Sequence, residues 1–292
     1  MKLVVFQLLN GFVWGWAVAL MALGLNLVYG VLRIINVAHG AFYMLGAVAG
    51  WAILEQLQRV SDLYTLNFTL ALLVAPLLVG LLGMFLEWTV LRPIESQPVL
   101  TIVATFALLL ILQQGVQLLL PGVQSMASPI TGGLELFGLR YPFYQWLVAG
   151  VSAASMLTLW LFLYRTRLGL WSRAVRQDPE LALAMGVPVP WVYGLTFGLG
   201  VSLAAVAGFL TAPIVHVEAS MGMDILLDSF IVVIVGGLGS LKGAVITALI
   251  FRLAEGLFTV WAEPVTAHAL ALLLMGALLL IKPNGLFGQY AD

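Results

Sequence analysis

The chain has 292 residues, of which 62% are hydrophobic and 9% are charged, and its mean hydropathy is +1.09. This composition excludes a soluble globular domain, the net charge of −1 gives no basis for binding nucleic acid, and the lack of cysteine excludes disulfides and thiolate catalysis. Because a span takes about 20 apolar residues, we expect an all-α polytopic membrane protein with about eight to nine transmembrane helices. Residues 1–292 would form a single transmembrane domain, with no soluble domain.

The first interruption of the apolar pattern lies near residues 29–40. It contains Asn36, His39 and Gly40, and Asn26 lies just before it. Polar groups at membrane depth are costly, so we expect them to face protein or water. They either line a path through the membrane or serve packing, since an Asn side chain can bond between helices and a His can bond a backbone carbonyl.

Residues 121–142 form a long, weakly charged linker that is rich in Gly, Pro and Ser. It lies between two apolar runs that each have the length of a span. We expect an ordered external loop at this position.

Six of the 25 charged residues gather in residues 165–190, which we call the arginine-rich segment. Its four arginines outnumber its two acids, and clustered Arg beside a span is typical of the cytoplasmic side. Asp178 predicts the N-cap of a short helix whose first turn holds Pro179 and Glu180, and Gly186 predicts its end. Such a helix between two spans is suited to docking onto a soluble partner, although an ordinary positively charged loop has the same composition.

A second interruption, residues 236–243, contains four glycines in eight residues. Each Gly costs a helix roughly 1 kcal/mol relative to Ala, so the chain bends or re-enters here. We take Gly236, Gly237, Gly239 and Ser240 as further candidates to line a path. The phosphate-loop pattern G-x-x-x-x-G-K-[ST] is absent, which argues against nucleotide binding by this glycine-rich stretch.

The distribution of Lys and Arg predicts a topology. If the arginine-rich segment is inside and the chain alternates direction, eight Lys and Arg residues lie inside and three outside, with Arg252 left within a span. This count requires two short crossings beside the glycine interruption, and it gives nine spans with the N-terminus outside and the C-terminus inside. A re-entrant interruption would change the topology of the last part.

Taken together, four groups of residues resemble the motifs of LivH-type permease subunits of bacterial ABC importers for branched-chain amino acids. The groups are residues 24–40, residues 173–178 with 184–186, residues 235–240 with 243–244, and residues 283–288. The similarity spans essentially the whole chain. Ala41 departs from the family pattern, because many relatives carry Glu there, so no carboxylate role is carried over.

The resemblance implies a protein of the bacterial inner membrane that works with a second related permease subunit, two cytoplasmic ATPases and an extracytoplasmic substrate-binding protein. The chain itself would be no enzyme and would bind no cofactor or metal, because the ATPases use the ATP. We expect residues 173–186 to form a short cytoplasmic helix that docks onto an ATPase. The candidate docking residues are Arg173, Arg176, Gln177, Asp178, Pro179, Glu180 and Gly186.

The cargo is less firmly defined. A path with apolar walls and a few amides suits a small neutral or zwitterionic solute, so leucine, isoleucine and valine lead, with other neutral amino acids, urea and short amides as alternatives. The alternative from another class is an ion-driven secondary transporter or channel. Few acids fall within the predicted spans, chiefly Glu87 and Glu255, and this scarcity weighs against ion coupling.

Overall fold

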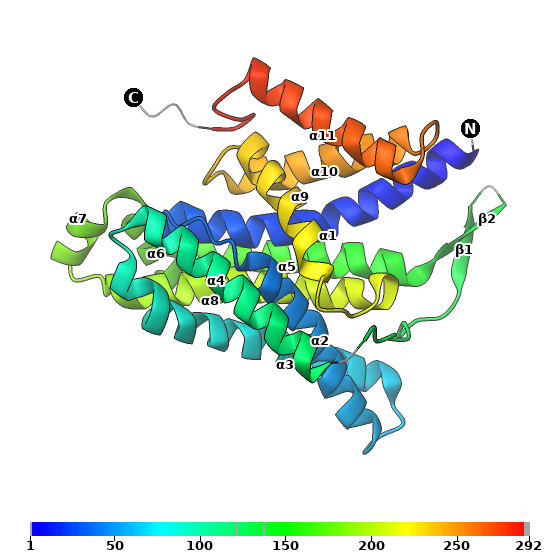
Figure 1. Cartoon of the computed structure of the whole chain (residues 1–292), viewed down its shortest axis with the longest axis horizontal. Coiled ribbons are helices and arrows are strands. Elements are labelled where there is room, and N and C mark those ends of the chain that lie inside the picture. Colours follow the sequence, from blue (N-terminus) through cyan, green and yellow to red (C-terminus); the bar gives the residue numbers. More distant parts are fainter. Residues whose placement is uncertain (1, 121, 137, 289–292) are drawn as a thin grey trace.

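The computed structural model describes residues 2–120, 122–136 and 138–288. This part of the chain consists of α-helices with one short β-hairpin (Figure 1). The helices are, in chain order, α1 (Lys2–Leu32), α2 (His39–Gln58), α3 (Tyr64–Leu86), α4 (Pro98–Leu119), α5 (Phe143–Arg165), α6 (Arg167–Gln177), α7 (Pro179–Ala184), α8 (Val189–Val215), α9 (Met221–Gly236), α10 (Leu241–Phe258) and α11 (Pro264–Ile281). A π-helical turn (Glu87–Leu91) and a 3₁₀ turn (Arg92–Ile94) extend α3, and the hairpin pairs β1 (Gly133–Leu136) with β2 (Leu139–Pro142).

Seven helices in the described residues are long and apolar enough to cross a membrane, namely α1, α2, the extended α3, α4, α5, α8 and α11. The all-α polytopic fold predicted from composition is therefore confirmed. The predicted count of eight to nine is larger because it includes α9 and α10, which flank the glycine interruption. α9 has only 16 residues, and α10 carries Lys242, Arg252 and Glu255.

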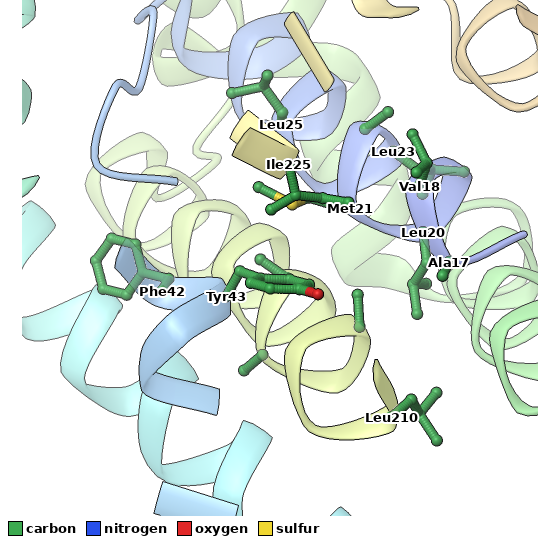
Figure 2. Packing of buried hydrophobic residues seen from close by; sticks show 14 of the residues in the cluster. Ala17, Val18, Leu20, Met21, Leu23, Leu25, Phe42, Tyr43, Leu210 and Ile225 are labelled. Atoms are coloured by element: carbon green, nitrogen blue, oxygen red, sulfur yellow. The ribbon is translucent and has the colours of Figure 1, made fainter. Parts of the chain in front are cut away.

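Helix α1 lies at the centre of the bundle, where it packs against α10, α8, α5 and α9. Its residues from Ala17 to Val28 are buried on all sides, as expected of a helix that is apolar all round. Figure 2 shows side chains of this stretch beside Tyr43 of α2 and Ile225 of α9. Any group that α1 carries toward its neighbours is therefore held in a fixed, packed position.

Helices α2 and α8 approach one another closely because small residues line their contact. A Cβ atom added at Gly46 would overlap the backbone of Ala205, and one added at Gly208 would overlap the carbonyl of Tyr43. Tyr43 also forms a hydrogen bond with the buried hydroxyl of Thr211 on α8. The first turns of α2 are thereby fixed against the middle of the bundle.

The bundle has two distinct ends (Figure 1). The start of α1 and the hairpin lie at one, which we call the hairpin end, while α6, α7 and residues 282–288 after α11 lie at the other, the arginine-rich end. Residues 124–127 of the predicted loop contact the bundle: the Tyr64 hydroxyl donates to the carbonyl of Ala127 at 2.5 Å, and Gln124 and Val217 exchange two backbone hydrogen bonds of 2.9 Å. The β-hairpin of this loop is an addition to the predicted all-helical fold.

Candidate functional site

At the arginine-rich end, capping side chains define two short helices. The hydroxyl of Thr166 accepts a hydrogen bond from Gly169 N at 3.0 Å and begins α6, and the carboxylate of Asp178 accepts one from Leu181 N at 2.9 Å and begins α7. Pro179 occupies the first position of α7, and Gly186 follows the helix with φ of 83°. The predicted start and end of a capped helix are confirmed.

The prediction of a single helix over residues 173–186 is wrong. Asp178 is extended, with φ of −153° and ψ of 104°, and it separates α6 from α7. The cause is Pro179, whose ring disfavours the helical conformation in the preceding residue. The docking candidates also divide, because the guanidinium of Arg173 faces inward and lies 4.8 Å from the ring centroid of Tyr164 on α5.

Helix α7 is anchored on one face and exposed on the other. Ala182 is buried in a small cluster with Val175 of α6, Val31 of α1 and Val189 of α8. The large apolar side chains of α7 and of the residue after it are exposed: Leu181 is 61%, Leu183 60% and Met185 78% exposed. The candidates Gln177, Asp178, Pro179, Glu180 and Gly186 are exposed in the same segment, and Arg176, also exposed, extends toward Gly239.

These three exposed apolar residues were not among the docking candidates, although the sequence carries a signal for them. They are large apolar side chains within a segment that is otherwise charged and that lies between two spans. Exposed large apolar side chains on an anchored helix mark a surface that can contact another protein or the membrane. We call Leu181, Leu183 and Met185 the α7 apolar surface.

The glycine interruption is held by Asn26 of α1. The Asn26 side chain donates to the carbonyl of Ser240 at 2.7 Å and accepts from Gly239 N at 2.5 Å. Gly237 and Gly239 have φ of 99° and 83°, a region that favours glycine. Asn26 therefore bonds helix α1 to the turn between α9 and α10. Of the two roles considered for this residue, this contact corresponds to hydrogen bonding in the packed bundle.

The residues after α11 complete this turn. Leu286 N donates to the carbonyl of Val235 at 2.7 Å, and Phe287 N donates to the carbonyl of Gly236 at 3.2 Å. These carbonyls belong to the last turn of α9, and the carbonyls of a last turn have no hydrogen-bond partners within their own helix. Residues 283–288 and residues 235–240, two of the motifs noted in the sequence, are thus joined by backbone hydrogen bonds.

The first interruption, between α1 and α2, is packed in a similar way. Nε2 of the buried His39 lies 3.1 Å from the carbonyl oxygen of Met21, and a Cβ atom at Gly40 would overlap the carbonyl of Gly222 on α9. The side chain of Asn36 is fully buried, and neither its nitrogen nor its oxygen has a hydrogen-bond partner among the described residues. Leaving such groups unbonded costs about 1–3 kcal/mol each.

The candidate path residues therefore form two groups that both contact α1. Asn26 lies with Gly239 and Ser240 toward the arginine-rich end, and His39 meets α1 near Met21. All eight candidates are buried except Ser240, which is half-buried. Asn26, His39, Ser240 and the four glycines pack or form hydrogen bonds with their neighbours, whereas the buried side chain of Asn36 has no hydrogen-bond partner among the described residues.

A charged network in the hairpin half of the bundle was not predicted. Arg252 of α10 forms an ion pair with Asp228 of α9 and donates to Glu255 at 2.7 Å. His268 of α11 lies 3.1 Å from Glu255. Together these contacts connect three helices.

The network borders a cavity of about 460 Å³ that also contacts α1, α2 and α8. Its lining contains four acids and one arginine, namely Glu218, Asp224, Asp228, Glu255 and Arg252. The spacing of Asp228 and Arg252 gives no signal for their contact, because they lie 24 residues apart on different helices. The other acid placed near a span, Glu87, is also paired, and Arg92 donates to it at 2.9 Å.

The comparisons with known proteins agree on one family. Residues 7–282 match the family model described as the permease component of branched-chain amino acid transport systems. The permease LivH of the high-affinity branched-chain amino acid system of Salmonella typhimurium is 29% identical over 97% of this chain and 95% of its own length. BraD of Pseudomonas aeruginosa is 28% identical over the same shares. A probable LivH of Methanocaldococcus jannaschii is 28% identical over 92% of this chain and 88% of its own.

No solved structure matches the chain, so the assignment depends on sequence. The family match begins in the first turns of α1 and ends at the residue after α11. It therefore includes both interruptions, the arginine-rich segment and every helix that is long and apolar enough to cross a membrane. This chain belongs to the family of permease components of branched-chain amino acid transport systems.

Proposed function

We propose that this chain is the transmembrane permease subunit of an ATP-driven ABC importer that moves branched-chain amino acids into the cell. The observation that carries the proposal is the family match over residues 7–282. The alignment to the LivH of Salmonella typhimurium covers 95% of that protein, so little of either chain is left for a different activity. The proposal places the chain in the bacterial inner membrane.

The α7 apolar surface supports docking of a cytoplasmic ATPase. The α7 apolar surface belongs to a helix that Ala182 anchors to the bundle. A displacement of α7 would therefore be transmitted to α1 and α8 through the contacts of Ala182. The sequence carries no nucleotide-binding motif, which is why ATP hydrolysis is assigned to separate subunits that act as a pair.

The proposed topology has the arginine-rich end in the cytoplasm. Residues 282–288 after α11 lie at this end and the start of α1 lies at the hairpin end, which agrees with an N-terminus outside and a C-terminus inside (Figure 1). Four arginines of residues 165–190, together with Arg33 and Lys242, favour the cytoplasmic side. The hairpin end would then meet an extracytoplasmic substrate-binding protein.

The path for cargo would run between this chain and a second, related permease subunit. Burial of Asn26, His39 and Gly40 supports a role for them in shaping the wall of that path rather than in contacting cargo. Asn36 differs, because its amide is unbonded among the described residues and remains free for a partner or for cargo. A wall of this kind suits leucine, isoleucine and valine before other neutral amino acids, urea or short amides.

Ion coupling is the alternative mechanism, and the pairing of acids weighs against it. Glu87 is neutralised by Arg92, and both Asp228 and Glu255 contact Arg252. An acid that must bind and release a cation in each cycle is poorly served by a permanent arginine partner.

Reconstitution tests the proposal. The chain is assembled with its partner permease and ATPases in proteoliposomes that contain ATP, and the binding protein is added outside with radiolabelled leucine. We expect uptake that requires ATP and the binding protein and that resists a protonophore. Uptake driven by an ion gradient without ATP would refute the ABC mechanism, and competition by urea or an amide but not by isoleucine or valine would refute the cargo.

A further inference from the structure

A cavity of about 470 Å³ at the arginine-rich end is lined by three cations from separate parts of the chain. They are Arg33 at the end of α1, Arg176 of α6 and Lys242 in the first turn of α10. The lining contains no acid, and none of the three cations forms an ion pair among the described residues. Three unpaired cations around one cavity indicate a site for an anion.

The N-terminus of α10 adds to this positive character. Ser240 caps the helix, since its hydroxyl accepts a hydrogen bond from Gly243 N at 3.1 Å, and Ser240, Leu241 and Lys242 all line the cavity. The start of a helix carries a partial positive charge and free backbone N–H groups, both of which favour a bound phosphate. The helix has 18 residues, so its dipole is fully developed.

A second cavity, of about 340 Å³, adjoins the first and is apolar. The two share Leu241 and Lys242, and Lys242 is the charged residue of the apolar lining. The other lining residues come from α1, α5 and α10: Trp16, Leu23, Met156, Leu157, Leu159, Trp160, Val245 and Ile246. A basic cavity that continues into an apolar groove matches the two parts of a phospholipid.

The dimensions fit one leaflet of a bilayer. Tyr164 of α5 lines the basic cavity, and Met156, eight residues earlier on the same helix, lines the apolar groove. At 1.5 Å per residue this interval is about 12 Å, close to half of the roughly 30 Å hydrocarbon core. A free phosphate ion would occupy the basic cavity but would leave the adjoining groove unexplained.

We propose that these two cavities form a binding site for an anionic phospholipid, with its phosphate between Arg33, Arg176 and Lys242 and an acyl chain in the groove between α1, α5 and α10. Basic pockets between membrane helices are suited to anionic headgroups. Gly239 also lines the basic cavity, so the bound lipid contacts the turn between α9 and α10 and the end of α6 at once.

Native mass spectrometry of the intact transporter complex tests the site. The complex is purified in mild detergent, depleted of lipid and titrated with phosphatidylglycerol, with phosphatidylcholine or with inorganic phosphate. We expect saturable retention of phosphatidylglycerol and weaker retention of phosphatidylcholine. Equal retention of both lipids would overturn the proposal, because the cations would then contribute nothing.

Two variants separate the headgroup from the acyl chain. The double variant Arg33→Gln/Lys242→Gln removes two cations, each worth about 1 kcal/mol for an anionic lipid, and should weaken phosphatidylglycerol binding on the order of 30-fold. Ile246→Trp fills the apolar groove and should weaken phosphatidylglycerol binding while leaving inorganic phosphate unaffected. Arg167→Gln is the matched control, since Arg167 is an exposed arginine at the same end and does not line either cavity.

The variants also define what would refute the lipid. Unchanged phosphatidylglycerol binding in Ile246→Trp, with inorganic phosphate competing at full strength, would assign the cavity to free phosphate. A loss in Arg167→Gln as large as in the double variant would indicate a general charge effect at this end. If the double variant does not fold, Lys242→Gln alone takes its place against Arg167→Gln, and Ile246→Trp still decides between lipid and free phosphate.

Discussion

The side-chain oxygen of Asn26 accepts a hydrogen bond from the backbone N–H of Gly239, at 2.5 Å, across 213 residues of sequence. The same amide donates to the carbonyl of Ser240. The amide nitrogen and oxygen of Asn26 therefore both bond the turn between α9 and α10. In this way a polar side chain of the buried helix α1 holds that turn in place.

Replacing Asn26 by leucine should destabilise the protein by about 2–4 kcal/mol. The change removes two hydrogen bonds and leaves Gly239 N–H and the Ser240 carbonyl without their partner in a buried place. Thermal unfolding of the purified complex measures the effect. Asn10→Leu is the control, because Asn10 bonds only Gln7 of its own helix at 3.3 Å, and equal melting temperatures for the two variants would contradict the assignment.

Gly239→Ala should destabilise the turn by about 1–2 kcal/mol, since Gly239 has φ of 83° and an alanine is strained there. Gly276→Ala is the matched control. Gly276 lies in α11 with nothing within 4 Å of an added Cβ, so the same substitution should be neutral or stabilise the helix by up to about 1 kcal/mol. Urea or thermal unfolding of both variants checks the sign, and a stabilised Gly239→Ala would show that the turn has another conformation.

The double variant Leu181→Ser/Leu183→Ser should fold but fail to hold the ATPase. Both side chains are about 60% exposed, so their loss costs the isolated chain little and costs a docked interface its apolar centre. Co-purification of the ATPase with the permease and ATP-dependent leucine uptake are the measurements. Val60→Ser is the control, because Val60 is 88% exposed and lies just after the C-terminal end of α2, and it should change neither co-purification nor uptake. Unaltered co-purification of the double variant would exclude α7 as the docking element.

Gly186→Leu should preserve expression and uncouple ATP hydrolysis from import. Gly186 has φ of 83° and open space around an added Cβ, so the change strains the backbone that ends α7 without a clash elsewhere. The ratio of ATP hydrolysed to leucine imported should rise. Gly150→Leu, in open space on α5, is the control, and a normal ratio for Gly186→Leu would show that the position of α7 does not govern coupling.

Arg252→Met should destabilise the protein by up to about 3–5 kcal/mol, because it removes the guanidinium, 15% exposed, that pairs with Asp228 and Glu255 and leaves these acids with their contacts to His268. Adding Asp228→Asn and Glu255→Gln to this variant should restore most of the loss. Arg59→Met is the control, since Arg59 and Glu55 are both well exposed and such pairs contribute at most about 1 kcal/mol. Similar melting temperatures for Arg252→Met and Arg59→Met would show that the network is solvated rather than buried.

The helices and their interruptions could be predicted from the sequence because they depend on local composition. Long apolar runs predicted the spans, four glycines predicted the break at residues 236–243, and Asp178 with Gly186 predicted the limits of α7. Each of these signals lies within a few residues of the structure it specifies. The division at Asp178 was also within reach, because Pro179 acts on its immediate neighbour.

The contacts that give each polar residue its partner could not be predicted in the same way. Asn26 was read as either a path residue or a packing residue, and the choice depends on a turn 213 residues away. Arg252 could not be assigned until α9 was placed beside α10, which brought it to Asp228. Arg173 and Arg176 are equivalent in the sequence pattern, and the contact of the Arg173 guanidinium with the ring of Tyr164 depends on the packing of α6 against α5.

The bonds from Leu286 and Phe287 to the last carbonyls of α9 bear on how the protein is made. The last turn of α9 is synthesised before these residues, so its carbonyls lack these partners until the segment after α11 has followed. A chain shortened by a nonsense mutation before Leu286 would insert all its membrane helices and still lack this closure. We therefore expect quality-control proteases to recognise such a product at the turn, although helices α1 to α11 are all present.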